Sequence, residues 1–212
     1  LPKTLKTIAP GAFQDCDALT AVFLPSSLSS FGAGAFSNCD SLKAIYVDTA
    51  NAYYMATITP DVHAGVLFDK TMKELVLYPA GRLVSEYETP STVKTINESA
   101  FSGNMYLNLL RISGSCTSIE KEAFRYSQSL TKVLVGSGVE SIGESAFANL
   151  SSLALVIFQG DAPELEVGGF EGVFKDTPLD LMVRFYPGTS GWDNDIWKNK
   201  YVTAIGNWNS GL

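Results

Sequence analysis

Apolar residues return along this chain at a fixed spacing of 23 residues. The first segment, LPKTLKTIAPGAFQDCDALTAVF, and the next, LPSSLSSFGAGAFSNCDSLKAIY, share one pattern of apolar and polar positions. The matched positions are Leu1 with Leu24, Leu5 with Leu28, Ile8 with Phe31, Phe13 with Phe36, Cys16 with Cys39, Leu19 with Leu42 and Val22 with Ile45. Self-similarity at one period is the signature of a repeat architecture, in which each unit buries its apolar face against its neighbours.

The Ala-Phe pair of this unit recurs further along the chain. It is found at Ala12–Phe13, Ala35–Phe36, Ala100–Phe101, Ala123–Phe124 and Ala146–Phe147. Phe170 follows another 23 residues on, behind Gly169, and we expect it to take the same place in the last unit. The repeat therefore predicts one elongated domain of stacked units.

Within a unit, the pattern Leu-x-x-Val-x-Leu of residues 19–24 predicts a short strand, because it is rich in β-branched and aromatic residues. Pro25 cannot donate a ladder hydrogen bond and ends the strand. The chain then turns, and Leu28 and Phe31 return to the core. The Gly-Ala-Phe segment predicts a single helical turn on the opposite side. A unit of 23 residues is too short for two full helices, so we expect one strand and one tight turn per coil.

Residues 47–88 break the period. Two apolar runs, GVLFD and KELVLYP, flank a short polar turn and predict a β-hairpin. We expect residues 75–78 to supply this unit's strand to the main sheet. The pattern leaves open whether Leu75 or Val76 points into the core.

The pattern decays again after Phe158. Residues 181–187, LMVRFYP, predict a last strand that arrives a few residues late. Terminal repeats must cover an open core end and are therefore atypical. We interpret Trp192, Trp197, Tyr201 and Ile205 as the residues of a C-terminal cap.

Composition narrows the class of protein. The chain has 212 residues, of which 46% are hydrophobic and 17% charged, which is typical of a folded protein. No apolar run approaches the roughly 20 residues of a membrane helix. The net charge of −7 disfavours nucleic acid as a partner. No signal peptide is expected within the chain, because its first residue already lies in a repeat and no charged segment precedes an apolar one.

Little in the sequence points to catalysis. His63 is the single histidine, lies in the irregular segment and is expected to be solvated. No nucleophile motif accompanies it, and a zinc site would need further His or Cys ligands nearby. The glycines of Gly32-Ala33-Gly34 belong to the repeat and lack the third glycine of a dinucleotide loop. We therefore expect no enzyme activity, no cofactor and no metal.

The three cysteines do not form a disulfide framework. Cys16 and Cys39 occupy equivalent positions of adjacent coils, and a spacing of about 5 Å between coils is compatible with a disulfide. The simpler interpretation is two small buried thiols. Cys116 occupies a position that other units fill with Leu or Val, so we expect it to be buried.

The unit L-P-x-x-L-x-x-I-x-x-x-A-F-x-x-C-x-x-L-x-x-V-x-L resembles the BspA-like leucine-rich repeat family of bacterial surface and secreted proteins. Residues 1–46 and 89–158 match it closely and the rest loosely. The resemblance implies an α/β repeat solenoid, right-handed, with short parallel strands on its concave face. It also implies an extracellular or cell-surface location and a role in binding other molecules, since some members are associated with host extracellular proteins.

Together, the repeat and the resemblance predict a single leucine-rich repeat domain over residues 1–212. Its parts are two regular repeats (1–46), an enlarged irregular unit with a hairpin (47–88), three regular repeats (89–157), and a degenerate repeat with the cap (158–212).

A candidate binding site follows from the alternation of side chains along each strand. The positions between the core residues face outward and form a largely apolar stripe with one arginine and one lysine. The proposed ligand-binding residues of this stripe are Phe23, Tyr46, Leu109, Arg111, Lys132, Leu134, Leu155 and Ile157, with Ala21 and Ala44 beside them. Contiguous exposed apolar surface usually marks an interaction site.

The sequence thus favours a non-enzymatic bacterial recognition module that binds protein through its concave sheet, with a host extracellular protein as a candidate partner. One alternative is a glycan-binding module that uses Tyr53, Tyr54, Trp192 or Trp197 as stacking platforms. The other is a structural spacer with no ligand of its own.

Overall fold

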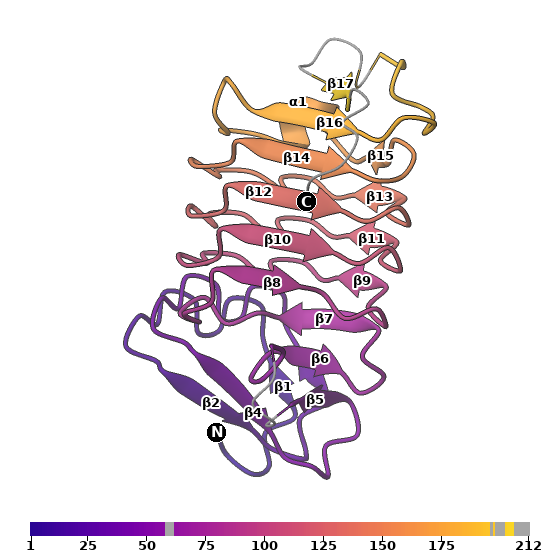
Figure 1. The fold of residues 1–212 in the computed structure, drawn as a ribbon. Coiled ribbons are helices and arrows are strands. Elements are labelled where there is room, and N and C mark those ends of the chain that lie inside the picture. The colour runs from indigo at the N-terminus through magenta and orange to yellow at the C-terminus, as the bar shows by residue number, and fades with distance from the viewer. Residues whose placement is uncertain (58–61, 196, 198–201, 206–212) are drawn as a thin grey trace.

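The chain forms a right-handed solenoid of stacked coils, shown as a ribbon in Figure 1. This computed structural model describes residues 1–57, 62–195, 197 and 202–205. Each regular coil contributes one four-residue strand, one two-residue strand and a hydrogen-bonded turn. The predicted leucine-rich repeat architecture is therefore confirmed.

The longer strands form a six-stranded parallel sheet, called the main sheet below. Its strands are β8 (Glu86–Glu88), β10 (Leu109–Ile112), β12 (Lys132–Val135), β14 (Leu155–Phe158), β16 (Met182–Phe185) and β17 (Val202–Ala204). Buried and partly exposed side chains alternate along β10, β12 and β14. The inward positions Leu110, Val133 and Val156 lie directly opposite one another across the strands, so the period of 23 places identical positions in one row.

The shorter strands form a second sheet of seven strands. It contains β9 (Thr95–Ile96), β11 (Ser118–Ile119), β13 (Ser141–Ile142) and β15 (Glu164–Leu165), which run parallel, together with β5 (Tyr54–Ala56), β6 (Leu67–Asp69) and β7 (Glu74–Leu77). The buried isoleucines of these short strands stack in register. The short strands thereby hold each of these coils to its neighbours on a side other than that of the main sheet.

The turn side of the solenoid is filled by a column of aromatic rings. Tyr78, Phe101, Phe124, Phe147 and Phe174 stack with centroid distances of 4.8, 5.1, 5.0 and 5.2 Å. These distances are close to the spacing of about 4.8 Å between adjacent strands. The turn backbones also bond from coil to coil, for example from Phe124 N to Ala146 O at 2.8 Å. The sequence predicted a single helical turn here. In the regular coils the structure has no helix at this place, and the turns bond to the neighbouring coils instead.

The enlarged unit forms the predicted hairpin, since β6 and β7 pair in antiparallel fashion. The expectation that residues 75–78 join the main sheet is wrong. Strand β7 pairs with β9 in the second sheet, and β8 supplies this unit's strand to the main sheet. Strand β7 ends at Leu77, and Tyr78, which follows it directly, lies in the aromatic column on the turn side. In the other coils it is the second sheet that leads into the turn, so β7 belongs to that sheet.

The hairpin divides the interior into two hydrophobic cores. Leu67, Val76 and Leu77 pack with the first two coils. Leu75 and Tyr78 pack with the larger core of the following coils. Both Leu75 and Val76 are thus buried, on opposite faces of one strand.

The first two coils form two small sheets of their own. Strands β1 (Thr7–Ile8) and β3 (Ser30–Phe31) form one, and β2 (Ala21–Leu24) and β4 (Ala44–Val47) form the other. Neither is hydrogen-bonded into the larger sheets, because the enlarged unit lies between: Ile45 N donates to Gly65 O at 2.9 Å. Figure 1 shows β2 and β4 inclined to the strands of the main sheet.

The last unit is longer than the others. Leu165 pairs with Ile142 as the period predicts, but the ring that continues the column from Phe147 is Phe174. The expectation for Phe170 is therefore wrong, because helix α1 (Gly169–Val173) takes up four extra residues, about one helical turn. Phe170 instead packs beside Phe174, at a centroid distance of 4.6 Å.

The C-terminal cap is built on two tryptophans. Trp192 stacks on Phe185 at 4.8 Å, and Trp197 packs edge-on against Phe158 at 5.4 Å. Both indoles are buried and close the larger core. Ile205 is half-buried, and Tyr201 lies outside the described residues.

We expect Phe124→Ala to lower the free energy of unfolding by about 3–5 kcal/mol, since it removes a fully buried ring from the middle of the column. Leu179→Ala, at a side chain that is 95% exposed, is the control and should stay within about 0.5 kcal/mol of the parent. Urea denaturation followed by circular dichroism measures both. Equal effects of the two substitutions would contradict the central role of the aromatic column.

Two neighbouring glycines test how closely the coils approach. A Cβ on Gly136 would lie 2.5 Å from the backbone nitrogen of Gly114, whereas a Cβ on Gly114 would meet Ser137 alone, with Oγ at 3.3 Å and the backbone nitrogen at 3.8 Å. We expect Gly136→Ala to destabilise the protein by at least about 1–3 kcal/mol through overpacking. Gly114→Ala should be tolerated. Thermal unfolding of the two variants compares them, and equal melting temperatures would show that the backbones have room to separate.

Candidate binding surfaces

The outward side of the main sheet carries a row of apolar side chains between charged ones. We call this surface the sheet face; it consists of Glu86, Glu88, Leu109, Arg111, Lys132, Leu134, Leu155, Ile157, Met182 and Arg184. Leu109, Leu134, Leu155 and Ile157 are half-buried, and Met182 is 42% exposed. The alternation predicted from the sequence is therefore the one that the strands adopt.

Strand register brings these side chains into two rows. One row runs from Leu109 through Lys132 and Leu155 to Met182. The other runs from Arg111 through Leu134 and Ile157 to Arg184. Directly opposed side chains on adjacent strands are close enough to touch, so the apolar groups of β12, β14 and β16 form one patch.

Charged groups border this patch. Arg111 Nη1 forms an ion pair with Glu86 Oε2 at 3.0 Å. In the described part of the chain, neither Lys132 nor Arg184 forms an ion pair with a carboxylate. Their positive charges are available to a partner at the edges of the apolar patch.

The remaining predicted site residues lie on a different sheet. Phe23 and Tyr46 are 54% and 44% exposed and lie opposite each other on β2 and β4, with Ala21 and Ala44 beside them. These strands are not hydrogen-bonded to the main sheet. The structure therefore brings together the predicted residues of β10, β12 and β14, and separately those of β2 and β4.

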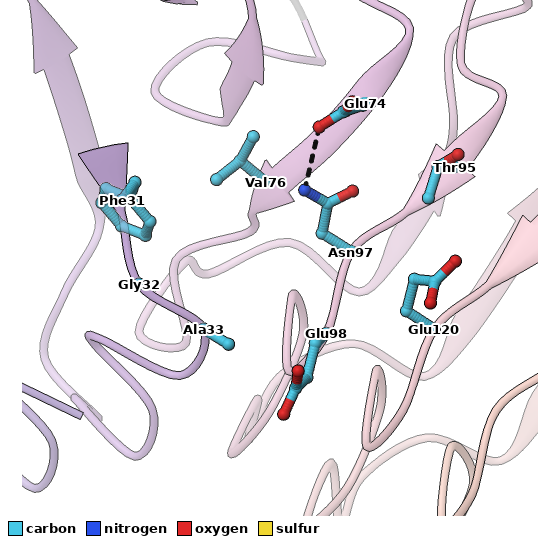
Figure 2. Close-up of a pocket in the computed structure, with 9 residues that line it drawn as sticks. All are labelled: Phe31, Gly32, Ala33, Glu74, Val76, Thr95, Asn97, Glu98 and Glu120. Atoms are coloured by element: carbon cyan, nitrogen blue, oxygen red, sulfur yellow. Dashed lines mark hydrogen bonds between the residues drawn. The ribbon is translucent and has the colours of Figure 1, made fainter. Parts of the chain in front are cut away.

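A seam lies between the first two coils and the rest of the solenoid, and it contains two hollows. The larger, of about 310 Å³, is lined from one side by Phe31, Gly32 and Ala33 (Figure 2). Glu74, Val76, Thr95, Asn97, Glu98 and Glu120 line its other side. Asn97 Nδ2 donates to Glu74 Oε2 at 3.2 Å across its wall. Three carboxylates make this hollow acidic.

The second hollow, of about 200 Å³, lies on the turn side of the seam. It shares Ala33 and Glu98 with the first. Its lining is almost entirely polar: Gln14, Ser37 and Asn38 from the first coils, and Ser99, Ser102, Glu122, Arg125 and Tyr126 from the later ones. Neither hollow was predictable from the sequence, because their walls come from segments far apart in the chain.

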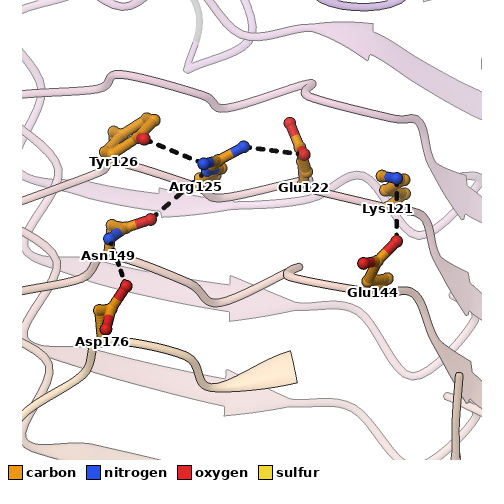
Figure 3. Close-up of polar contacts among 7 residues, drawn as sticks. All are labelled: Lys121, Glu122, Arg125, Tyr126, Glu144, Asn149 and Asp176. Atoms are coloured by element: carbon orange, nitrogen blue, oxygen red, sulfur yellow. Dashed lines mark hydrogen bonds and ion pairs between the residues drawn. The ribbon is translucent and has the colours of Figure 1, made fainter. Parts of the chain in front are cut away.

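A polar network fixes the side chains beside this second hollow (Figure 3). Arg125 donates to Glu122 Oε1 at 2.9 Å, to the Tyr126 hydroxyl at 3.0 Å and to Asn149 Oδ1 at 3.4 Å. Asn149 in turn donates to Asp176. The arginine is thus held in place and its charge is already balanced by a carboxylate.

The single histidine is not solvated as expected. His63 is half-buried, its Nδ1 lies 3.0 Å from the Tyr87 hydroxyl, and its ring packs edge-on against Phe68 and Tyr87. The enlarged unit folds back over the larger core and buries this side chain. In the parts of the chain that the structure describes, no three His, Cys, Asp or Glu residues are placed to hold a metal ion.

The cysteines are thiols in the structure. Cys39 is buried and donates to Phe13 O at 3.0 Å, whereas Cys16, in the first coil, is half-buried. Burial raises the pKa of Cys39 and of Cys116 to about 11. Because the thiolate is the nucleophile, both groups are poorly reactive at neutral pH.

The aromatic platforms considered for a glycan are mostly covered. Trp192 is 6% exposed and Trp197 is fully buried, so neither offers a ring face to a sugar. Tyr54 is half-buried and packs on Phe31 at 6.1 Å. Tyr53, at 55%, is the exposed member of the four. The tryptophan-rich segment builds the cap instead.

The model of the BspA type leucine rich repeat region matches residues 1–57 and 80–178, in six copies. No curated protein matches the chain in sequence. None of the described helices is both long and apolar enough to cross a membrane.

Several solved structures share the fold. A leucine-rich repeat protein from Eubacterium ventriosum superposes with a TM-score of 0.74 at 22% identity, covering 97% of this chain and 53% of its own. A leucine rich cell surface protein from Faecalibacterium prausnitzii gives 0.74 at 22%, covering 100% and 56%. The pneumococcal vaccine antigen PcpA gives 0.69 at 21%, covering 95% and 59%. The chain thus spans little more than half the length of these proteins.

The matched family model covers most of the chain. The chain belongs to the BspA-type leucine-rich repeat family.

Proposed function

We propose that this chain is a non-enzymatic recognition module of a bacterial surface or secreted protein, and that it binds a protein ligand through the sheet face. The observation that carries the proposal is the patch of Leu134, Leu155, Ile157 and Met182, which stays partly exposed on three adjacent strands. Contiguous apolar surface of this kind commonly marks an interaction site.

The sheet face has the physical properties of a protein-binding surface. Its strands β10, β12 and β14 are each hydrogen-bonded on both sides, so the backbone loses little freedom on binding. Leucine and isoleucine supply apolar contact area at its centre, and Met182 can adapt its shape to a partner. The positive charges of Lys132 and Arg184 at the border would favour a partner with acidic groups around an apolar centre.

The surface location rests on relatives. Proteins with the same fold include one described as a cell surface protein and one described as a vaccine antigen. Membership of the family supports the same location for this chain. A host extracellular protein is the partner class that we propose for it.

The exposed pair Phe23 and Tyr46 is proposed as a second contact area for a ligand long enough to pass the seam. Because these residues lie on a separate sheet, their contribution can be measured independently of the main sheet. Tyr46→Ala weakens binding if the ligand spans both areas.

Leu134→Asp is the direct test. We expect it to weaken binding by at least about tenfold, because it places a charge in the middle of the apolar patch. The measurement is surface plasmon resonance against a panel of purified extracellular-matrix proteins, namely fibronectin, fibrinogen, laminin and collagen. Leu179→Asp introduces the same charge at an exposed leucine outside the sheet face and serves as the matched control.

Unchanged binding by Leu134→Asp would contradict a role for the sheet face. Equal weakening by both variants would indicate a general charge effect. If the parent protein binds no member of the panel, the spacer interpretation gains support.

A further inference from the structure

We propose that the second hollow of the seam is a binding site for a neutral sugar ring, separate from the sheet face. We call it the serine hollow, after Ser37, Ser99 and Ser102, which line it. The proposal concerns a different surface and a different ligand class from the protein-binding function, and it does not depend on that function.

The first observation is a set of three serine hydroxyls that line the hollow and bond to no other described residue. Ser37, Ser99 and Ser102 are 8%, 7% and 8% exposed. None of their Oγ atoms forms a hydrogen bond with another residue among those that the structure describes. These Oγ atoms are not among the enclosed side-chain atoms that lack a partner, so they are open to solvent and can bond to a ligand that enters the hollow.

These hydroxyls converge within the hollow. Ser37 Oγ and Ser99 Oγ lie 3.1 and 3.6 Å from the position that a Cβ on Gly34 would take. Gly34 has a φ of +62° and leaves this space open. Ser37 belongs to the first coils and Ser99 to the later ones, so the site exists only where the two parts of the solenoid meet.

The second observation is the backbone of the coil beside the hollow. Each of the five regular coils has two positions in the left-handed region. In other coils they are occupied by small or turn-forming residues: Gly11, Gly34, Ser99 and Ser145 at one, and Asp15, Asn38, Gly103 and Asn149 at the other. In this coil they are Glu122 and Tyr126, with φ of +54° and +63°.

Long side chains at both left-handed positions carry a conformational cost that smaller residues avoid. Glu122 and Tyr126 are joined through Arg125, which bonds to both (Figure 3). The two strained residues, Glu122 and Tyr126, and the arginine that joins them all line the serine hollow. Strained residues of this kind concentrate at ligand sites.

The chemistry of the lining selects the ligand class. Serine hydroxyls donate and accept, the Gln14 amide does both, and Glu98 and Glu122 accept. This set matches the alternating donors and acceptors of a sugar's hydroxyl groups. Apolar side chains are nearly absent, so an aliphatic ligand would gain little here. An acidic sugar or a phosphate is disfavoured, because the two carboxylates lie in the wall and Arg125 is already paired.

The size of the hollow agrees with one ring. Its volume of about 200 Å³ is below the roughly 300–1,000 Å³ of sites for drug-sized ligands. The larger hollow adjoins it at Ala33 and Glu98 and offers Phe31 and further carboxylates (Figure 2). A second ring of an oligosaccharide would extend into this space.

The experiment is saturation-transfer NMR on the full chain. The probes are glucose, galactose, mannose and N-acetylglucosamine, together with lactose and maltose, and sialic acid is the acidic comparison. We expect millimolar binding of at least one neutral sugar and weaker binding of sialic acid. A lack of binding to every neutral probe, or a preference for sialic acid, would overturn the proposal.

Two exposed positions provide a matched pair of variants. Gln14→Trp fills the mouth of the serine hollow and should weaken sugar binding by at least about tenfold. Lys175→Trp changes the residue at the same place of the repeat, also exposed but outside the hollow, and should bind like the parent. Equal binding by both variants would exclude the serine hollow as the site.

The double variant Ser37→Ala and Ser102→Ala tests the hydroxyls themselves. It should weaken sugar binding by about tenfold or more. Its melting temperature without sugar should not fall, because the removed groups bond to no residue of the free protein. A fall in melting temperature with unchanged sugar binding would assign these serines a structural role instead. Leu134→Asp should leave sugar binding intact, which separates this site from the sheet face.

Discussion

The stacking of equivalent side chains from coil to coil is the constraint on which this structure depends. A ring such as Phe124 is buried only because Phe101 and Phe147 lie directly on either side of it. A single coil has no core of its own, so each residue of the unit must keep its place relative to the next coil. Units of irregular length conform to this rule. The last unit takes up four residues in α1, and the enlarged unit shortens the path from β7 to Tyr78, so that both deliver an aromatic ring to the column.

The hairpin of the enlarged unit also keeps the coils stacked, but it interrupts the main sheet. Its strand β7 is apolar on both faces, since Leu75 and Val76 are buried in different cores. The strand can therefore lie between the two hydrophobic cores and contact both. The main sheet is interrupted as a result, and the first two coils are inclined to the rest (Figure 1). The seam and its hollows are direct consequences of this insertion.

The periodic parts of the fold were predictable because their information is local and repeated. The inward and outward faces of β10, β12 and β14 follow from spacing alone. The strand of residues 75–78 was assigned to the wrong sheet, because a short apolar run reads the same in either. Phe170 was expected in the aromatic column because it keeps the period of 23, which the four extra residues of the last unit break.

The two candidate sites also differ in how far the sequence could predict them. The sheet face follows from alternation within each strand, so most of its residues could be named from the sequence. The serine hollow could not, because Ser37 and Ser99 meet only after the enlarged unit has folded between them. The environment of His63 has the same origin, since Tyr87 belongs to the far end of that unit. Contacts across an irregular insertion carry no periodic signal.

The outward positions of the main sheet are informative because folding does not determine them. Strand β8 has Glu86 and Glu88 at these places and pairs with β10 in the same register as the other strands. Charged residues are therefore compatible with the sheet, and they would keep it soluble at no expense to the core. The leucine and isoleucine side chains of β12 and β14 expose apolar surface that the fold does not need. This exposed apolar surface, which folding does not require, is the physical basis of the binding role that we propose for the sheet face.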